Sequence, residues 1–385
     1  MGDFVYSEGL LKRVELILKE CNGCGRCKDN CEMLSTFNIN PKELIKIAKK
    51  INPDPIIPYS CNMCGTCTHV CQNKIRLQDV FFEMRKELIK NNNGKSPIKG
   101  HKAIALHQSL SFSKIFNTAV SDEIAGFTKA VFIPGCSLAS YSPKLVGKTL
   151  AYLQQKLPGT GAILKCCGNP TLSLGLEERF NKRYSQLEKE IENSGAEVII
   201  TACQNCFTTI SKFSPKLKVK SLWTVIAKLG LTSEMKNKGK LSDITFSIHD
   251  SCPTRYNSEI QDSVRWIINE LGYKVNESPL SRENTVCCGY GGMIVPANPK
   301  LSLKVMKKSS QRYDEDYIIT YCASCREAQI KGGKKALHIL DLIFNDTYYK
   351  SSKINGLNKS FIQNWTKRYR SKKNLESFTK YKEKL

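Results

Sequence analysis

Short apolar runs alternate with longer amphipathic segments from residue 130 to about residue 345. The apolar runs are rich in Val and Ile, which is typical of buried strands. The strands expected from them cover residues 130–134, 162–165, 197–202, 244–249 and 316–321, with 273–275 a short strand or turn. Between them, apolar positions at helical spacing predict helices over 143–157, 176–194, 258–271 and 299–313. Strands that alternate with helices in this way predict an α/β fold with parallel sheets.

The N-terminal 97 residues lack this alternation and are expected to be helical, with helices at 4–20, 41–51 and 77–90. Residues 91–94 (Asn-Asn-Asn-Gly) and the pair Ser96-Pro97 mark a linker. Residues 98–128 are expected to form a mixed helical connector. The predicted organisation is a helical domain, the connector, two α/β modules and a basic tail, over residues 1–97, 98–128, 129–240, 241–345 and 346–385.

Cysteine is the unusual component of the composition, with 18 among 385 residues. The N-terminus lacks the apolar core of a signal peptide, and no apolar run reaches the roughly 18 residues that a membrane span needs. We therefore expect a cytoplasmic protein. In that compartment this many cysteines favour metal binding or redox chemistry over disulfides, which are the alternative that the sequence leaves open.

Two cysteine runs with the spacing C-x2-C-x2-C-x3-C flank the second expected helix. The first run is Cys21, Cys24, Cys27 and Cys31, and the second run is Cys61, Cys64, Cys67 and Cys71. In two-cluster ferredoxins the first three thiolates of a run bind one cubane [4Fe-4S] cluster, and the fourth ligates the other cluster. We therefore expect Cys71 to complete the site of the first run and Cys31 to complete that of the second. A pair of zinc sites is the alternative, but it leaves the third and fourth cysteines of each run without a role.

A second pattern, C…CC-G…C-x-x-C, occurs twice in the α/β region. The first set is Cys136, Cys166, Cys167, Cys203 and Cys206, and the second set is Cys252, Cys287, Cys288, Cys322 and Cys325. Every cysteine recurs, which indicates a duplication. Most of them follow expected strands, at the edge where open α/β sheets carry their sites. Glycine after each vicinal pair permits a positive φ or a close approach of backbone to a cluster, although an ordinary glycine loop is the alternative.

These motifs resemble the cysteine-rich domain of heterodisulfide reductases, which also occurs in iron–sulfur subunits of glycerol-3-phosphate, glycolate and lactate oxidoreductases. The stretch CNMCGTCTHVC and the following DVFFEMR resemble the ferredoxin subunit of heterodisulfide reductase. Glu32 and Gln72 stand where proline usually follows the fourth cysteine of a run. The resemblance implies an α-helical ferredoxin domain followed by two duplicated Rossmann-like α/β modules, here called the first and second CCG modules. Joined in one chain, these parts are similar to the fused catalytic subunit of the cytochrome-linked enzyme.

The resemblance also implies a set of cofactors and a reaction. In that family each complete five-cysteine set holds a non-cubane [4Fe-4S] cluster, so two of these are implied beside the two cubanes. The implied reaction is reductive cleavage of a disulfide, a two-electron step fed by one-electron carriers. His249 lies in a segment similar to the family's HDPCH, although Ser251 and Pro253 replace its proline and second histidine. It is a candidate proton donor, or alternatively a strand-ending histidine with a satisfied hydrogen bond.

A second function stays open at this stage, that of an electron-transfer subunit for a flavin-dependent lactate, glycolate or glycerol-3-phosphate dehydrogenase. No G-x-G-x-x-G fingerprint opens a β-α unit, so no flavin or nicotinamide site is expected in this chain. The expected partners are a flavoprotein dehydrogenase, a hydrogenase or a membrane cytochrome subunit, with a small disulfide or thiol as substrate.

The formal net charge is +24, but lysines are spread along the chain and no nucleic-acid-binding module is visible. An acidic redox partner or an anionic membrane surface suits such a charge. Within the tail, Phe361, Trp365 and Tyr369 recur every four residues, followed by Leu375 and Phe378, with basic residues between. This pattern predicts a basic amphipathic helix, which either lies on the inner face of the cell membrane or packs its aromatic side chains on the ferredoxin domain.

Overall fold

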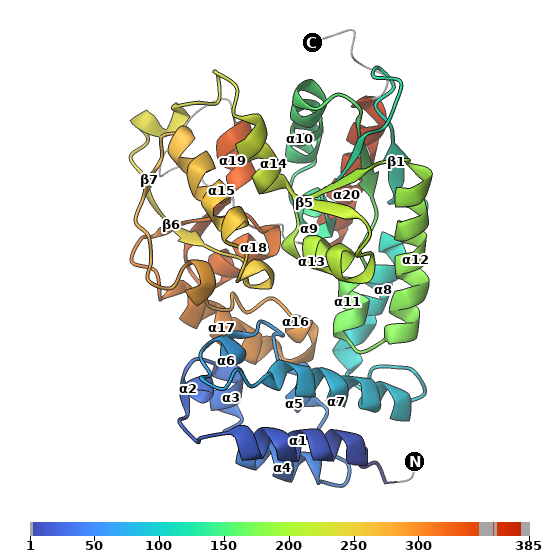
Figure 1. The fold of residues 1–385 in the computed structure, drawn as a ribbon, viewed down its shortest axis with the longest axis vertical. Coiled ribbons are helices and arrows are strands. Elements are labelled where there is room, and N and C mark those ends of the chain that lie inside the picture. The colour runs from blue at the N-terminus through green and yellow to red at the C-terminus, as the bar shows by residue number, and fades with distance from the viewer. Residues whose placement is uncertain (1–2, 346–356, 358–359, 379–385) are drawn as a thin grey trace.

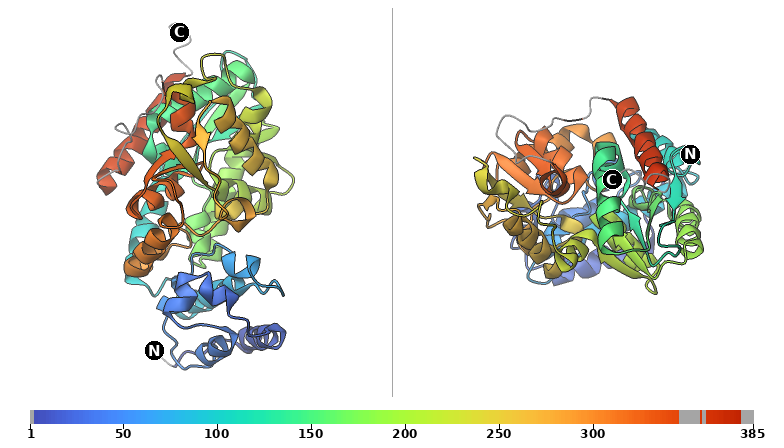
Figure 2. Two further views of the ribbon diagram at one scale, coloured as in Figure 1. Left: turned by 90° about the vertical axis from the view of Figure 1, so that its left-hand side faces the viewer. Right: turned by 90° about the horizontal axis from the view of Figure 1, so that it is seen from above.

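The computed structural model describes residues 3–345, 357 and 360–378. A helical domain forms one end of the molecule, and two α/β modules stand side by side above it (Figure 1). Seen from the side, the helical domain is a separate layer beneath both modules (Figure 2). This mixed α/β architecture confirms the predicted fold class.

The N-terminal domain is built on three helices, α1 (Glu8–Glu20), α4 (Pro41–Ala48) and α7 (Leu77–Asn91). The Ser7 side chain caps α1, and Asn40 caps α4 immediately before Pro41, which suits the first position of a helix. The cysteine runs lie in loops and in the short helices between them. Cys27 and Cys67 are in α2 (Arg26–Asp29) and α6 (Thr66–His69), Cys31 directly precedes α3 (Glu32–Thr36), and α5 (Ile56–Tyr59) precedes the second run.

The first module contains a five-stranded sheet with the order β1-β3-β2-β4-β5. Its parallel strands are β2 (Ala130–Ile133), β3 (Thr160–Leu164), β4 (Val198–Thr201) and β5 (Lys218–Ser221). The helices of the module are α9 (Cys136–Tyr141), α10 (Pro143–Lys156), α11 (Asn169–Ser173), α12 (Glu177–Asn193), α13 (Gln204–Phe213) and α14 (Leu222–Leu229).

The second module repeats this plan with a four-stranded parallel sheet of order β7-β6-β8-β9. The strands are β6 (Thr245–His249), β7 (Lys274–Val275), β8 (Tyr317–Thr320) and β9 (Lys335–His338). The helices are α15 (Ser258–Glu270), α16 (Ile294–Ala297), α17 (Pro299–Ser310), α18 (Ala323–Lys331) and α19 (Ile339–Phe344), with a 3-10 turn η3 (Cys252–Thr254). One hydrophobic core runs through both modules, because α14 packs against α15 and α10 against α19.

The connector differs from the expected helical segment in one respect. It contains η1 (Lys99–His101) and α8 (Lys102–Ser111), but then β1 (Thr118–Val120), which pairs antiparallel with β3. Three residues are too few to show a strand period in the sequence.

The tail forms the expected helix, α20 (Phe361–Phe378), but it does not pack on the ferredoxin domain. It lies along α9 and α10 of the first module, with Trp365 and Leu375 buried, whereas Phe361 and Tyr369 are largely exposed. The buried face of α20 is therefore formed by Trp365, Arg368, Ser371 and Leu375, and not by the aromatic residues alone. Among the described helices, none is both long enough and apolar enough to cross a bilayer.

Candidate functional site

The structure brings Cys71 to the first cysteine run. Cys21, Cys24, Cys27 and Cys71 line one cavity of about 430 Å³ at the carboxyl end of α1, and Cys67 of the second run also lines it. Burial raises the pKa of Cys27, and the neighbouring thiols of Cys21, Cys71 and Cys24 raise it further. Four thiols around one cavity are the donor set that a cubane [4Fe-4S] cluster takes. We call this the outer site, because Cys24 is exposed.

The second run gathers in the same way around Cys31, which precedes α3. Burial raises the pKa of Cys31 to about 12, and the nearby Cys64 and Cys61 thiols act in the same direction. The pKa of Cys67 is raised by burial and by Cys61, Cys64 and Cys31. Buried thiols that raise one another's pKa need a cation to hold them as thiolates, and the irons of a cluster supply it. We call this the inner site.

The five cysteines of the first CCG module form a continuous series of sulfur contacts. The series runs from Cys136 through Cys166, Cys167 and Cys206 to Cys203. Hydrogen bonds from Cys166 and Cys206 lower the pKa of Cys167 to about 5. Gly168, which follows the vicinal pair, has a φ of 80°, so the positive φ that the sequence suggested is present. All five thiols thus lie where one polynuclear iron–sulfur centre fits their donor set.

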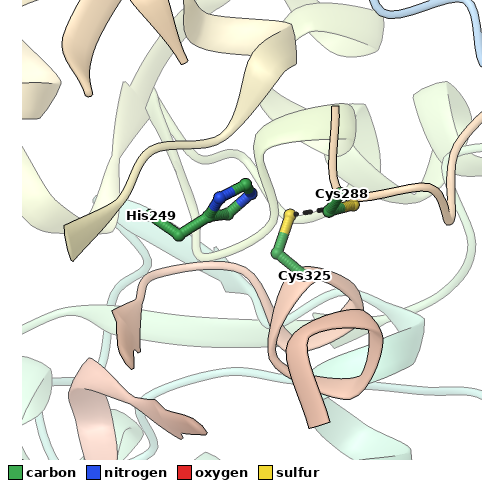
Figure 3. Close-up of side chains that lie close together, drawn as sticks. All are labelled: His249, Cys288 and Cys325. Atoms are coloured by element: carbon green, nitrogen blue, oxygen red, sulfur yellow. Dashed lines mark hydrogen bonds between the residues drawn. The ribbon is translucent and has the colours of Figure 1, made fainter. Parts of the chain in front are cut away.

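The second CCG module brings two thiols close to a buried histidine. The Cys325 and Cys288 sulfurs lie 3.5 Å apart, and the ligand atoms of His249, Cys288 and Cys325 all lie within 4.8 Å of one another. Figure 3 shows the Cys325 sulfur between the His249 ring and Cys288 in this view, with the dashed line joining Cys325 to Cys288. Hydrogen bonds from Cys325 and His249 hold the pKa of Cys288 well below its usual value. Cys322 contacts Cys325, and Cys252 lies near Cys288 and Cys322.

The hydrogen bonds of His249 identify which ring nitrogen carries the proton. Nδ1 lies 2.7 Å from the Tyr313 hydroxyl and 3.2 Å from Gln329 Nε2. The Gln329 amide is oriented by Ser310, which donates to its Oε1, so Nε2 is the donor facing His249. Nδ1 is therefore an acceptor, and the proton of the neutral ring lies on Nε2. His249 thus has a satisfied hydrogen bond, as one interpretation of the sequence held, and still presents an N–H group to Cys288.

Cys287 does not join this group closely but contacts Cys64 of the inner site. A sulfur–sulfur hydrogen bond from Cys287 lowers the pKa of Cys64 to about 6 and raises that of Cys287. The inner site and the second CCG site therefore touch directly, although Cys64 and Cys287 are more than 200 residues apart in the chain.

Two glycines after Cys288 make this contact possible. A Cβ at Gly292 would lie 2.2 Å from the Cys61 carbonyl oxygen, and one at Gly291 would lie 2.7 Å from that of Asn62. Both distances are too short for any side chain, so glycine is required where the module's loop meets the cysteine loop of the ferredoxin domain. The glycine-rich stretch serves this close approach between two backbones.

Two buried arginines hold the same interface together. Arg85 donates to the carbonyl oxygens of Pro58 and Cys61 in its own domain, of Ser173 in the first module and of Gly292 in the second. Arg255 donates to Glu283 and Thr285 of its own module and to Thr66 beside Cys64, with Nη2 also 3.4 Å from the Cys64 carbonyl. The sequence motifs assign a role to neither residue. The burial of Arg85 could have been predicted from the sequence, because Arg85 lies on the apolar face of α7 with Phe81 and Leu88.

The two CCG sites also approach each other. Helix α9, which starts at Cys136, packs against α18, which contains Cys325, and η3, which starts at Cys252, packs against α13, which contains Cys206. The Ser137 and Ser324 hydroxyls hydrogen-bond across this contact at 2.9 Å. The duplicated modules therefore face each other through equivalent elements.

Comparison with known proteins agrees with this arrangement. Residues 17–75 match the 4Fe-4S dicluster domain family, and residues 130–211 and 246–330 each match the cysteine-rich domain family. The chain is 22% identical to one of the polypeptides of the dihydromethanophenazine:CoB–CoM heterodisulfide reductase of Methanosarcina barkeri, over 91% of this chain and 97% of that protein.

Two further relatives carry other names. The chain is 24% identical to one of the polypeptides of the fumarate reductase (CoM/CoB) of Methanothermobacter marburgensis, over 85% of this chain and 72% of that protein. It is 26% identical to the EtfAB:quinone oxidoreductase of Syntrophomonas wolfei, over 83% of this chain and 56% of that protein. All three relatives are named as reductases or oxidoreductases. The chain is therefore a heterodisulfide reductase-like iron–sulfur oxidoreductase, with a 4Fe-4S dicluster domain followed by two cysteine-rich domains.

Proposed function

We propose that the protein passes electrons from the outer site through the inner site to the two CCG sites, where a disulfide is reduced. The observation that carries this proposal is the contact between Cys64 and Cys287, which joins the ferredoxin domain to the second CCG site. The exposed Cys24 supports the outer site as the point where electrons arrive, because a partner protein can approach it. Cys288, Cys322 and Cys325 are buried, which suits the receiving end.

Each binding site is assigned its own ligands in this proposal. The outer cubane takes Cys21, Cys24, Cys27 and Cys71, and the inner cubane takes Cys61, Cys64, Cys67 and Cys31. The two CCG sets hold one non-cubane [4Fe-4S] cluster each. When bound, the clusters supply electrons one at a time, and two electrons with two protons convert R–S–S–R′ into RSH and R′SH.

His249 is assigned to the proton side of this reaction. Its Nε2–H group faces Cys288, and its Nδ1 accepts hydrogen bonds from Tyr313 and Gln329, which fix the ring. A neutral imidazole held in this tautomer donates a hydrogen bond to sulfur and transfers its proton when negative charge develops there.

A quinone-linked or flavoprotein-linked electron-transfer role is the second candidate. The similarity to the EtfAB:quinone oxidoreductase favours it, because that relative is named for a flavoprotein donor and a quinone acceptor. In this role the clusters are the same, but no disulfide is cleaved in the CCG sites.

Anaerobically reconstituted protein distinguishes the two candidates. We expect about sixteen irons per chain from four [4Fe-4S] clusters, and oxidation of the reduced protein by mixed disulfides such as the CoM–CoB heterodisulfide. The Cys288→Ser variant is expected to lose disulfide turnover while its cubane EPR signals persist. About eight irons with a purely cubane spectrum would contradict the assignment of the CCG sites. Oxidation by a quinone analogue but by no disulfide would favour the second candidate.

A further inference from the structure

A buried arginine lies beside the first CCG site. Arg368, on α20, is 1% exposed and its guanidinium lies over the Trp365 ring, but none of its three nitrogens forms a hydrogen bond of normal geometry among the described residues. A buried charge without compensation is strongly destabilising, so such a group is retained where an anion lies next to it. Lysine and arginine elsewhere on α20, such as Arg370 and Lys373, reach solvent instead.

The neighbours of Arg368 indicate that this anion lies at Cys136. Helix α20 is fixed on α9 by Ser371, which donates to the Ala139 carbonyl at 2.8 Å, and by Lys367, which donates to the Tyr141 carbonyl at 3.2 Å. Arg368 lies between these two anchors along α20 and contacts the Cys136 thiol at the start of α9. Cys166 and burial raise the pKa of this thiol, and Arg368 opposes that shift. The other titratable neighbour is His107, whose pKa is lowered to about 4 by burial and by Arg368. A neutral His107 offers no compensating charge.

The connector closes the same site from its other side. Gln108 on α8 is fully buried and donates to the Cys166 sulfur at 3.4 Å, while its Oε1 accepts from Thr171 at 2.9 Å. Helix α8 and helix α20 meet over the site, because the Trp365 ring packs on His107 at 5.2 Å between ring centres. Both contributing helices lie outside residues 130–211, the segment that matches the cysteine-rich domain family.

The second CCG site has a different environment at the equivalent position. With Cys136 aligned to Cys252, His249 at the end of β6 corresponds to Ile133 at the end of β2. The first site therefore has no strand-borne histidine but receives a permanent cation from a helix at the far end of the chain. Guanidinium stays charged at every working pH.

We propose that Arg368 is the counter-charge of the first CCG site and raises the reduction potential of the iron–sulfur centre held by Cys136 and Cys166. The inference rests on the proposed function in requiring an anionic centre at that site. Reduction adds one negative charge to the centre, and a fixed positive charge nearby favours the more negative state. Arg368 acts electrostatically on the centre, and the two duplicated sites thereby acquire different reduction potentials.

The test is an EPR-monitored redox titration of full-length, cluster-loaded protein. Arg368→Gln removes the charge, Arg368→Lys keeps it, and Arg370→Gln removes an exposed charge from the same helix. We expect Arg368→Gln to shift one midpoint potential to more negative values, and we expect this signal to be the one that Cys136→Ser abolishes. Arg368→Lys should retain most of the wild-type value, and Arg370→Gln should match the wild type.

Two further measurements separate a tuning effect from misfolding and from failure of the proposed function. Unchanged cubane signals and iron content in Arg368→Gln are expected, and loss of every cluster in both Arg368 variants would overturn the tuning role in favour of a folding role. A midpoint unaltered in Arg368→Gln, with the centre present, would refute the inference alone. Wild-type protein with no EPR signal beyond the cubanes would refute the proposed function as well.

Discussion

Replacing Arg85 with methionine is expected to undock the ferredoxin domain from the CCG modules. Methionine keeps an unbranched side chain of similar length but removes all five donated hydrogen bonds, which end on carbonyl oxygens of three separate parts of the chain. Those carbonyl groups belong to Pro58, Cys61, Ser173 and Gly292. Arg85 is fully buried, so no water is at hand to replace the lost donors.

The magnitude follows from the four acceptors left behind. A buried acceptor without a donor costs about 1–3 kcal/mol, so the four together cost roughly 4–12 kcal/mol. Removing the guanidinium also removes its desolvation penalty, which offsets several kcal/mol. A net loss of about 3–5 kcal/mol remains, which is a large part of the 5–15 kcal/mol that typically stabilises a domain. The loss of stability in Arg85→Lys should lie between those of the wild type and Arg85→Met, because a single ammonium group reaches fewer of the four oxygens.

Anaerobic urea denaturation followed by circular dichroism measures this loss. Lys86→Met is the matched control, since Lys86 is the next residue of α7, forms surface ion pairs with Glu83 and Glu177 and lies over the Phe82 ring. Such pairs contribute about 0–1 kcal/mol. We expect Arg85→Met to unfold in two steps, with the ferredoxin domain separating first, and Lys86→Met in the same manner as the wild type. A single transition for Arg85→Met, with the midpoint of Lys86→Met, would refute the role assigned to Arg85.

Three other predictions follow from particular residues. Cys31→Ser should alter the EPR signal of the inner site and spare that of the outer site, and Cys71→Ser should do the opposite. If Cys31→Ser instead altered the outer signal and Cys71→Ser the inner signal, the exchange of fourth ligands would be contradicted. Burial and Arg326 lower the pKa of His338 to about 3, so the unfolded chain gains a proton below pH 6.5 that the folded chain does not take up. Stability should fall by up to about 1.4 kcal/mol per pH unit as the pH drops below 6.5, and His338→Gln should remove that portion of the slope in urea titrations at several pH values. Ending the chain at Asn345 should lower the melting temperature, because burial of the Trp365 and Leu375 side chains contributes roughly 1.5–3 kcal/mol each to stability. Co-sedimentation of both lengths with anionic vesicles tests the membrane expectation, and salt-sensitive binding lost with the tail would support it.

The sequence predicted the repeating parts of the fold because their signals are local. The strands that carry Val and Ile at their centres, such as β4 and β8, lie within one residue of the predicted bounds at either end. Strand β5 escaped detection because it is an edge strand, and its sequence Lys-Val-Lys-Ser has exposed lysines where a central strand has apolar residues. The grouping of the cysteines was predictable for a similar reason, since fixed spacing brings thiols together within one loop or between two equivalent loops.

The surroundings of the sites could not be predicted, because they depend on contacts between distant segments. Nothing near Cys166 in sequence indicates that Gln108 donates to it, and nothing near Cys64 indicates the contact with Cys287. The tail illustrates the limit most clearly. Its basic residues suggested a solvated or membrane-bound face, yet Arg368 is buried. A charge can be stable inside a protein where an opposite charge lies next to it.

The duplication therefore fixes the ligands of the two CCG sites but leaves their functions free to differ. The second site touches the inner site through Cys287 and presents His249 to Cys288, which are the contacts that the proposed function uses for electrons and for a proton. The first site is enclosed by α8 and α20 and contacts the second module. In the proposed function electrons would reach the first site through the second, and a cation beside the last centre of such a series favours their arrival. The order of the sites and the placement of Arg368 thus support the same direction of flow, toward the first CCG module.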